Sequence, residues 1–227
     1  MGYSLVLLDL DGTLLDFEEA QRKGIEKALN EFGLPYSDKV LDAYVRVNDR
    51  WWIEFEKGAA SKDELFIRRF VDFLEEMGWN KELAASINTY YLQILPSCKV
   101  ISELSLNLCK ELSKRADIVI ATNGDEKGQM STIESSGIMS YIKGVAVSEA
   151  IGWPKPDPRF FSYAMGLVSP REKRETLMVG DSLSADIRGG MDFGIDTCWF
   201  NPKGSPAVQG IEPTYTIMDL AQILEIV

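Results

Sequence analysis

The sequence predicts an α/β fold, in which a parallel β-sheet is flanked by helices and interrupted by an all-helical insert. The first strand reads Leu5-Val6-Leu7-Leu8. It is continuously apolar, which is typical of a strand buried on both faces of a parallel sheet. After about residue 96, short strands alternate with helices, which implies right-handed crossovers. Between about residues 17 and 95 the hydrophobic pattern is instead helical almost throughout.

The insert is predicted to contain successive helices that begin and end at recognisable signals. Ser61 with Glu64 three residues later forms a capping-box start, and Pro96 is expected to close the last helix. Gly33-Leu34-Pro35 is a helix stop followed by a breaker. The predicted helices are 18–32, 38–57, 61–78 and 81–95.

The remainder of the chain is predicted to build the sheet and its covering helices. The strands are expected at 3–9, 117–121, 144–147, 176–179 and 195–200, and the helices at 100–115, 126–136, 158–167 and 183–193, before a short C-terminal strand and helix. We therefore expect one α/β domain formed by residues 1–15 and 96–227, and a helical domain formed by residues 16–95.

Composition restricts the classes of function. The chain has 227 residues and a net charge of −11, which argues against binding a nucleic-acid polymer or an anionic membrane. It has no run of apolar residues long enough to span a membrane and does not open with a signal peptide. The cysteines are odd in number and lack metal-site spacing. We expect a reduced, cytoplasmic protein.

The sequence contains no histidine. This absence excludes Ser-His-Asp and Cys-His catalysis and every zinc site that uses histidine ligands. Any chemistry must therefore depend on carboxylates, hydroxyls, amides, lysine and a metal held by oxygen atoms.

Asp9 and Asp11 follow the first strand, where two carboxylates two residues apart need a neutralising partner. A hard divalent cation is one such partner, because it prefers oxygen ligands. The alternative is a strand that ends in a hairpin turn, because Asp11-Gly12 is a common hairpin signal.

Other predicted strands also end in polar residues, namely Thr122-Asn123-Gly124, Ser148-Glu149 and Gly180-Asp181. Each could be an ordinary turn or helix cap, but ligands of parallel sheets bind outside the carboxyl ends of the strands. Lys155 lies among prolines that restrict its backbone. Asp186 falls in the first turn of a helix, where a carboxylate also favours the helix dipole.

In order along the chain, Asp9-x-Asp11-Gly12-Thr13, Thr122-Asn123-Gly124, Lys155-Pro156 and Gly180-Asp181-x4-Asp186 resemble the four motifs of the haloacid dehalogenase-like superfamily. The resemblance implies a Rossmann-like sheet with the helical insert as a cap domain. Within the insert, a set of residues is similar to the cap of pyrimidine 5′-nucleotidase-type members: Asn48, Trp52, Phe55, Gly58, Ser61, Leu65, Arg69 and Phe70. The chain departs from that branch at Met130-Ser131-Thr132, where such members often carry Arg-Leu.

The resemblance also implies a role for each motif residue. Asp9 would be the nucleophile and Asp11 the general acid and base. Mg²⁺ would be held by Asp9, the Asp11 carbonyl and Asp181, with Asp186 acting behind them. The phosphate would be held by Thr122, Asn123, Gly124 and Lys155. Superfamily members that dehalogenate lack the aspartate at the position of Asp11, so its presence favours phosphoryl transfer.

We therefore expect a Mg²⁺-dependent phosphatase for small phosphomonoesters, acting on nucleoside 5′-monophosphates as a monomer or homodimer. The alternatives are a sugar-phosphate or phosphoglycolate phosphatase, a phosphomutase, and a module that binds a metal or phosphate without turnover. In the cap, Trp51, Trp52 and Phe55 could stack on a base, but we expect at least two of them in the core.

Overall fold

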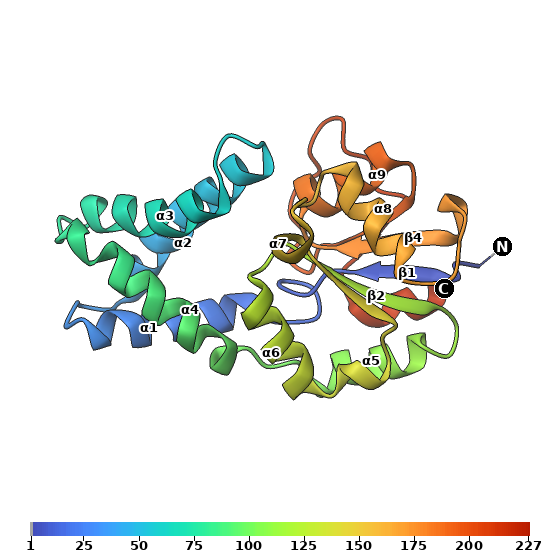
Figure 1. The fold of residues 1–227 in the computed structure, drawn as a ribbon, viewed down its shortest axis with the longest axis horizontal. Coiled ribbons are helices and arrows are strands. Elements are labelled where there is room, and N and C mark those ends of the chain that lie inside the picture. The colour runs from blue at the N-terminus through green and yellow to red at the C-terminus, as the bar shows by residue number, and fades with distance from the viewer. Residues whose placement is uncertain (1) are drawn as a thin grey trace. The chain divides into compact units, whose positions relative to one another are not determined.

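The computed structural model describes residues 2–227 and divides the chain into two compact units. Within the described residues, unit 1 comprises 2–17 and Val100–Val227, and unit 2 comprises Glu18–Lys99. The boundaries expected from the sequence, at 15/16 and 95/96, lie near these limits. Figure 1 shows a sheet with flanking helices in unit 1 and helices alone in unit 2.

The sheet of unit 1 has six strands in the order β3-β2-β1-β4-β5-β6, and all of its pairings are parallel. The strands are β1 (Leu5–Leu8), β2 (Asp117–Thr122), β3 (Gly144–Val147), β4 (Thr176–Gly180), β5 (Asp196–Phe200) and β6 (Tyr215–Ile217). The first strand is shorter than the predicted 3–9. It pairs with β2 on one side and β4 on the other, so the hairpin alternative at Asp11-Gly12 is wrong.

Successive residues of β1 point into separate cores on the two faces of the sheet. Val6 and Leu8 contact the core that includes Cys109, whereas Leu5 and Leu7 contact the core that includes Phe160. The first face is covered by α5 (Glu103–Leu112) and α6 (Glu126–Ser136), and the second by α8 (Pro158–Gly166) (Figure 1). Burial on both faces explains the continuously apolar strand.

Several helices of unit 1 differ in detail from the predictions. The helix expected at 183–193 begins as a π-helical segment, η4 (Leu183–Arg188), and continues as α9 (Gly189–Phe193). Ser182 caps η4 through its hydroxyl, which accepts from the Ala185 amide at 3.1 Å. A short helix, α7 (Ser148–Ile151), was not predicted. The other small elements are η2 (Ile138–Ser140), η3 (Lys173–Glu175), η5 (Leu220–Gln222) and α10 (Ile223–Ile226).

Unit 2 contains α1 (Phe17–Glu31, which begins at the unit boundary), α2 (Asp38–Glu56), α3 (Lys62–Glu76), η1 (Lys81–Leu83) and α4 (Ala84–Cys98). The capping box of Ser61 and Glu64 is present at the start of α3. Pro96 does not close α4 but lies inside its last turn. A proline there removes one backbone donor, and the helix still ends on the bond from the Lys99 amide to the Leu95 carbonyl.

The core of unit 2 is aromatic. The Tyr44 ring lies 5.3 Å from the Phe70 ring and 5.5 Å from the Phe73 ring, centroid to centroid. Phe55 is buried, but Trp51 and Trp52 are only half-buried, so the expectation that at least two of the three lie in the core is wrong.

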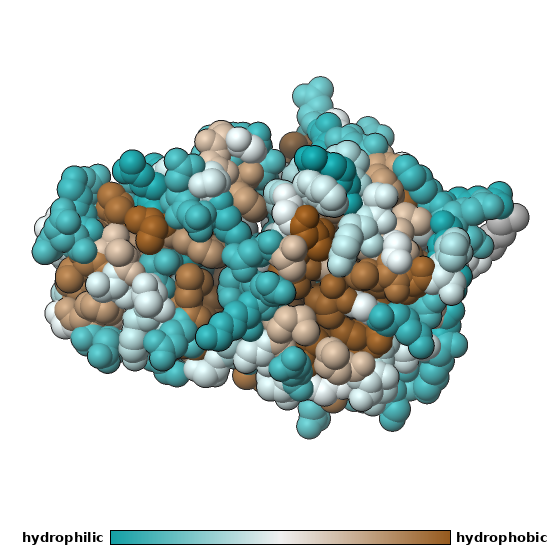
Figure 2. Space-filling view, in the orientation of Figure 1, coloured by the Kyte–Doolittle hydropathy of each residue, from teal (hydrophilic) through white to brown (hydrophobic). Residues whose placement is uncertain are grey.

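The surface in Figure 2 is mostly hydrophilic, with separate hydrophobic patches on this face. In residues 2–227, the structure contains no helix that is both long and apolar enough to cross a membrane.

Candidate active site

The parallel register brings the carboxyl ends of the central strands to one edge of the sheet. Leu8 of β1 lies opposite Ile120 of β2 and Val179 of β4. The residue that follows, Asp9, donates its backbone amide to the Val179 carbonyl at 2.9 Å and therefore stays aligned with β4. Its carboxylate is consequently held at the edge where β2 and β4 also end.

Lys155 is a buried cation at this edge. Its side chain is 2% exposed, and its Nζ atom donates to Asp9 Oδ1 at 2.8 Å, Asp186 Oδ1 at 2.6 Å and the Ala121 carbonyl at 2.6 Å. An ammonium group has three hydrogens, so all of them are directed to acceptors. Lys155 thereby joins the ends of β1 and β2 to η4.

The Asn123 side chain holds the backbone of Lys155. Its amide nitrogen donates to the Lys155 carbonyl at 2.9 Å, and its amide oxygen accepts from the Lys155 backbone nitrogen at 2.9 Å. The sequence-based expectation used the Asn123 main-chain amide for phosphate and missed this role of the side chain. No local pattern could have revealed it, because the two residues are 32 positions apart.

Asp9, Asp181 and Asp186 form a carboxylate cluster, with ligand atoms within 4.8 Å of one another. Thr13 Oγ1 donates to Asp9 Oδ2 at 3.1 Å and lies 3.4 Å from Asp181 Oδ1. The Trp199 indole donates to the Asp181 carbonyl at 3.0 Å and steadies that loop. Thr13 belongs to the first motif but was given no role there, and Trp199 was not expected to take part.

The charges of this cluster shift the pKa values of its members. Burial, with the negative charge of Asp186, raises the pKa of Asp9 to about 7 in spite of the Lys155 ammonium. Desolvation of the carboxyl and the charges of Asp9 and Asp186 raise the pKa of Asp181 well above its usual value. Burial alone would lower the pKa of Lys155, but Asp186 and Asp9 raise it, so Lys155 stays cationic.

When its three carboxyl groups are ionised, the cluster has three negative charges and only the Lys155 ammonium to offset them. Their oxygen donors are those preferred by a hard divalent cation such as Mg²⁺ or Mn²⁺. Asp186 is already engaged, through Oδ1 with Lys155 and through Oδ2 with the Ser182 amide at 3.1 Å. Asp9 is engaged in a similar way, through Oδ1 with Lys155 and through Oδ2 with Thr13, so a cation bound by Asp9 would share these oxygens.

Asp11 lies beside the end of β2. Its Oδ2 atom accepts from Gln129 Nε2 at 2.6 Å. Gln129 Nε2 also donates to Thr122 Oγ1 at 2.8 Å, and the Gly124 amide donates to the same hydroxyl at 3.1 Å. The Gly124 amide is expected to bind phosphate. To do so, it must either donate to the phosphate and Thr122 Oγ1 together or give up its bond to Thr122 Oγ1. Gln129 was not among the expected site residues.

Glu149, which follows β3, does not contact these residues through its Oε2 atom. That atom accepts from the Glu126 amide at 2.7 Å, at the start of α6.

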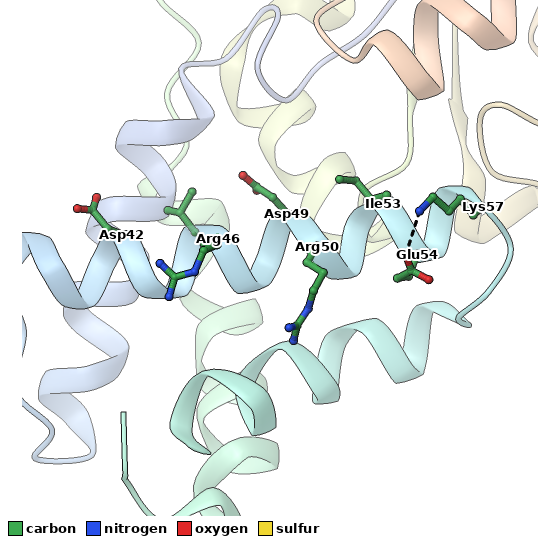
Figure 3. Close-up of a pocket in the computed structure, with 8 residues that line it drawn as sticks. Asp42, Arg46, Asp49, Arg50, Ile53, Glu54 and Lys57 are labelled. Carbon is green, nitrogen blue, oxygen red and sulfur yellow. Dashed lines mark hydrogen bonds and ion pairs between the residues drawn. The ribbon is translucent and has the colours of Figure 1, made fainter. Parts of the chain in front are cut away.

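Unit 2 carries a surface groove along one face of α2, which Figure 3 shows with the Glu54–Lys57 ion pair. Its charged side chains balance, with three acidic and three basic residues: Asp42, Asp49, Glu54, Arg46, Arg50 and Lys57. This balance favours neither an anionic nor a cationic ligand, and the groove contains none of the strand-end residues.

Comparisons with known proteins match nearly the whole chain. A family model for haloacid dehalogenase-like hydrolases matches residues 6–200. The pyrimidine 5′-nucleotidase PynA of Streptococcus pneumoniae is 32% identical, over 99% of this chain and 95% of its own length. The pyrimidine 5′-nucleotidase YjjG of Escherichia coli is 26% identical, over 98% and 97%.

Among solved structures, the magnesium-bound crystal structure of the HAD-hydrolase YfnB from Bacillus subtilis is similar over 100% of this chain and 99% of its own. It has a TM-score of 0.94 and 32% identity.

Proposed function

The chain belongs to the haloacid dehalogenase-like hydrolase family, and from this premise we propose that it is a Mg²⁺-dependent phosphatase of small phosphomonoesters. Nucleoside 5′-monophosphates are the proposed substrates. The nucleotidase relatives support this substrate class, because each alignment extends over nearly the full length of this chain and of the relative.

The difference in environment between Asp9 and Asp11 carries the proposal. Asp9 is buried beside the Lys155 ammonium and in the carboxylate cluster, whereas Asp11 Oδ2 meets the neutral amide of Gln129. The Lys155 ammonium favours the ionised form of Asp9 that a nucleophile needs and opposes the burial that raises its pKa. A carboxyl group beside a neutral donor suits a group that exchanges a proton in each step.

In the first step, an Asp9 oxygen attacks phosphorus and the bond from phosphorus to the ester oxygen breaks. Asp11 gives its proton to that oxygen, so the leaving group departs as an alcohol and Asp9 becomes an aspartyl-phosphate. In the second step Asp11 takes a proton from water as the water oxygen attacks phosphorus. The bond from Asp9 to phosphorus breaks, and inorganic phosphate leaves.

The remaining residues bind and orient. Lys155 lies against Asp9 and offsets negative charge beside the phosphoryl group, while Thr122 and the amides of Asn123 and Gly124 hold its oxygens. Asp9, the Asp11 carbonyl and Asp181 would hold Mg²⁺, which when bound supplies positive charge against the phosphoryl oxygens. Asp186 orients Lys155. Unit 2 is the proposed cap, which would exclude water and contact the leaving group.

A substrate panel tests the proposal. Phosphate release is measured with pyrimidine and purine nucleoside monophosphates, sugar phosphates and phosphoglycolate, each with Mg²⁺ and with EDTA. We expect Mg²⁺-dependent release that is fastest with nucleotides. Equal rates on sugar phosphates would remove the nucleotide assignment, and transfer to a second hydroxyl without phosphate release would indicate a phosphomutase.

The covalent step has its own test. Intact-mass measurement after rapid quenching should show one added phosphoryl group on the wild type and none on Asp9→Asn. Undiminished turnover by Asp9→Asn would refute the mechanism, and no turnover by a folded, Mg²⁺-loaded wild type on any ester would favour a binding module.

A further inference from the structure

Gln129 is a fully buried polar residue at the candidate site. It lies on α6 with 0% of its side chain exposed, and its amide nitrogen is 2.6 Å from Asp11 Oδ2 and 2.8 Å from Thr122 Oγ1. A buried amide retains its place only when its hydrogens meet acceptors. Here both hydrogens of Nε2 are directed into the site.

The direction of the amide follows from its partner. An ionised carboxylate only accepts hydrogen bonds, so the nitrogen and not the oxygen of Gln129 must face Asp11. With Oδ2 of Asp11 occupied by this donor, the proton that Asp11 exchanges is carried on Oδ1. Gln129 therefore determines which oxygen of Asp11 acts as the acid.

The second contact of Gln129 orients Thr122. The Thr122 hydroxyl oxygen accepts from Gln129 Nε2 and from the Gly124 amide at 3.1 Å, which uses both of its lone pairs. Its single hydrogen must then point away from these two groups. A hydroxyl fixed in this way is a donor, which is what a phosphoryl oxygen requires.

The backbone at Gly124 leaves room for this amide. A Cβ atom added to Gly124 would lie 2.0 Å from Gln129 Nε2, much closer than such atoms approach. The glycine that follows Thr122-Asn123 therefore permits the contact between α6 and the end of β2.

We propose that Gln129 is a positioning residue that aligns Asp11 as the general acid and Thr122 as a phosphate donor. This inference rests on the proposed function, because it needs Asp11 to protonate the leaving group. It extends that function to a side chain outside the sequence motifs, 118 positions from Asp11.

The test compares two leaving groups in one experiment. The leaving group of a nucleoside 5′-monophosphate is the nucleoside 5′-oxygen, a strongly basic alkoxide that needs a proton from an acid. The leaving group of p-nitrophenyl phosphate is p-nitrophenolate, which is stable without one. The parameter is kcat/KM, which reports only the steps up to transfer of the phosphoryl group to Asp9. The variants are Gln129→Met, similar in shape without a donor, and Gln129→Glu, which places a second carboxylate against Asp11.

The Asp11→Asn variant provides the benchmark and Thr132→Val the matched control. Thr132 is also buried on α6, but its hydroxyl donates to the Gly128 carbonyl of the same helix. Loss of the acid at Asp11 should lower kcat/KM for the nucleotide by about 100-fold or more. We expect Gln129→Met to lower kcat/KM for the nucleotide by roughly 10- to 100-fold, with a much smaller loss for the aryl ester. Gln129→Glu should cause a larger loss than Gln129→Met.

Thr132→Val should leave the ratio of the two esters unchanged. If Gln129→Met lowers both esters equally, or neither, while Asp11→Asn separates them, the inference is wrong and the proposed function stands. If Asp9→Asn keeps wild-type turnover, the proposed function and this inference fail together. Circular dichroism and thermal unfolding of each variant show that the fold is retained.

Discussion

Replacing Lys155 with methionine should destabilise the protein because it leaves two carboxylates buried without a cation. Asp9 is 6% exposed and Asp186 1% exposed, and both bond to Lys155 Nζ. Removing one partner from a buried ion pair costs about 3–5 kcal/mol. Methionine retains most of the aliphatic volume, so lost packing adds little. We expect a loss of about 4 kcal/mol from a free energy of unfolding that is about 5–15 kcal/mol in ordinary domains.

Urea unfolding in EDTA measures this loss, provided that unit 1 is followed separately from unit 2. Cys109 and Cys198 are buried in unit 1, and Cys98 is buried in unit 2. Pulsed thiol labelling with mass spectrometry therefore reports each unit's transition, and the midpoint shift at constant m gives the change in free energy.

A second substitution supplies the sharper test. In the wild type, Asp186→Asn should destabilise unit 1 by about 1–3 kcal/mol, because Lys155 loses a charged acceptor. In the Lys155→Met background the same change should be stabilising, because it removes an uncompensated buried charge. A loss below about 1 kcal/mol for Lys155→Met, or an Asp186→Asn effect of the same sign in both backgrounds, would refute the argument.

Two further substitutions test the site, and one tests the capping box at the start of α3. Asp9→Asn should lower turnover by at least about 1,000-fold without unfolding the protein, which phosphate release and circular dichroism check. Gly180→Ala should lower kcat by about 100-fold, because the new Cβ would lie 2.1 Å from Asp186 Oδ2 and displace it. The control Gly166→Ala has nothing within 4 Å of its Cβ and should keep full activity. Finally, the capping hydrogen bonds lower the pKa of Glu64, so their stabilisation is present above its unfolded pKa and is lost as pH falls through the folded value. Thermal unfolding of Glu64→Gln against wild type should differ at pH 7 and converge in acid, and an unchanged difference would contradict this.

The elements themselves were predictable where the signal is local. The apolar run Leu5–Leu8 and the capping box at Ser61 act within a few neighbouring residues, and the structure shows both of them. The prediction that Pro96 closes its helix was wrong, because the helix continues for another two residues. The helix predicted at 183–193 is present over those residues, but its first part has π-type turns that no local signal indicated.

Residue identity and local pattern were enough to name the candidate chemical groups of this protein. Polar residues after apolar strands made Asp9, Asp11 and Asp181 candidates for the site, and the absence of histidine left carboxylates, hydroxyls, amides, lysine and an oxygen-bound metal as candidates for the chemistry. These properties depend only on residue identity and on hydrophobic patterns that repeat every two to four residues.

The partners of those residues became visible only in the folded chain. It placed Lys155 between Asp9 and Asp186, the Asn123 side chain on the Lys155 backbone, and Gln129 against Asp11. A hydrogen bond forms only when its donor and acceptor atoms lie within a few ångströms of each other. Such positions are set by strand register and helix packing between segments as far as 146 residues apart.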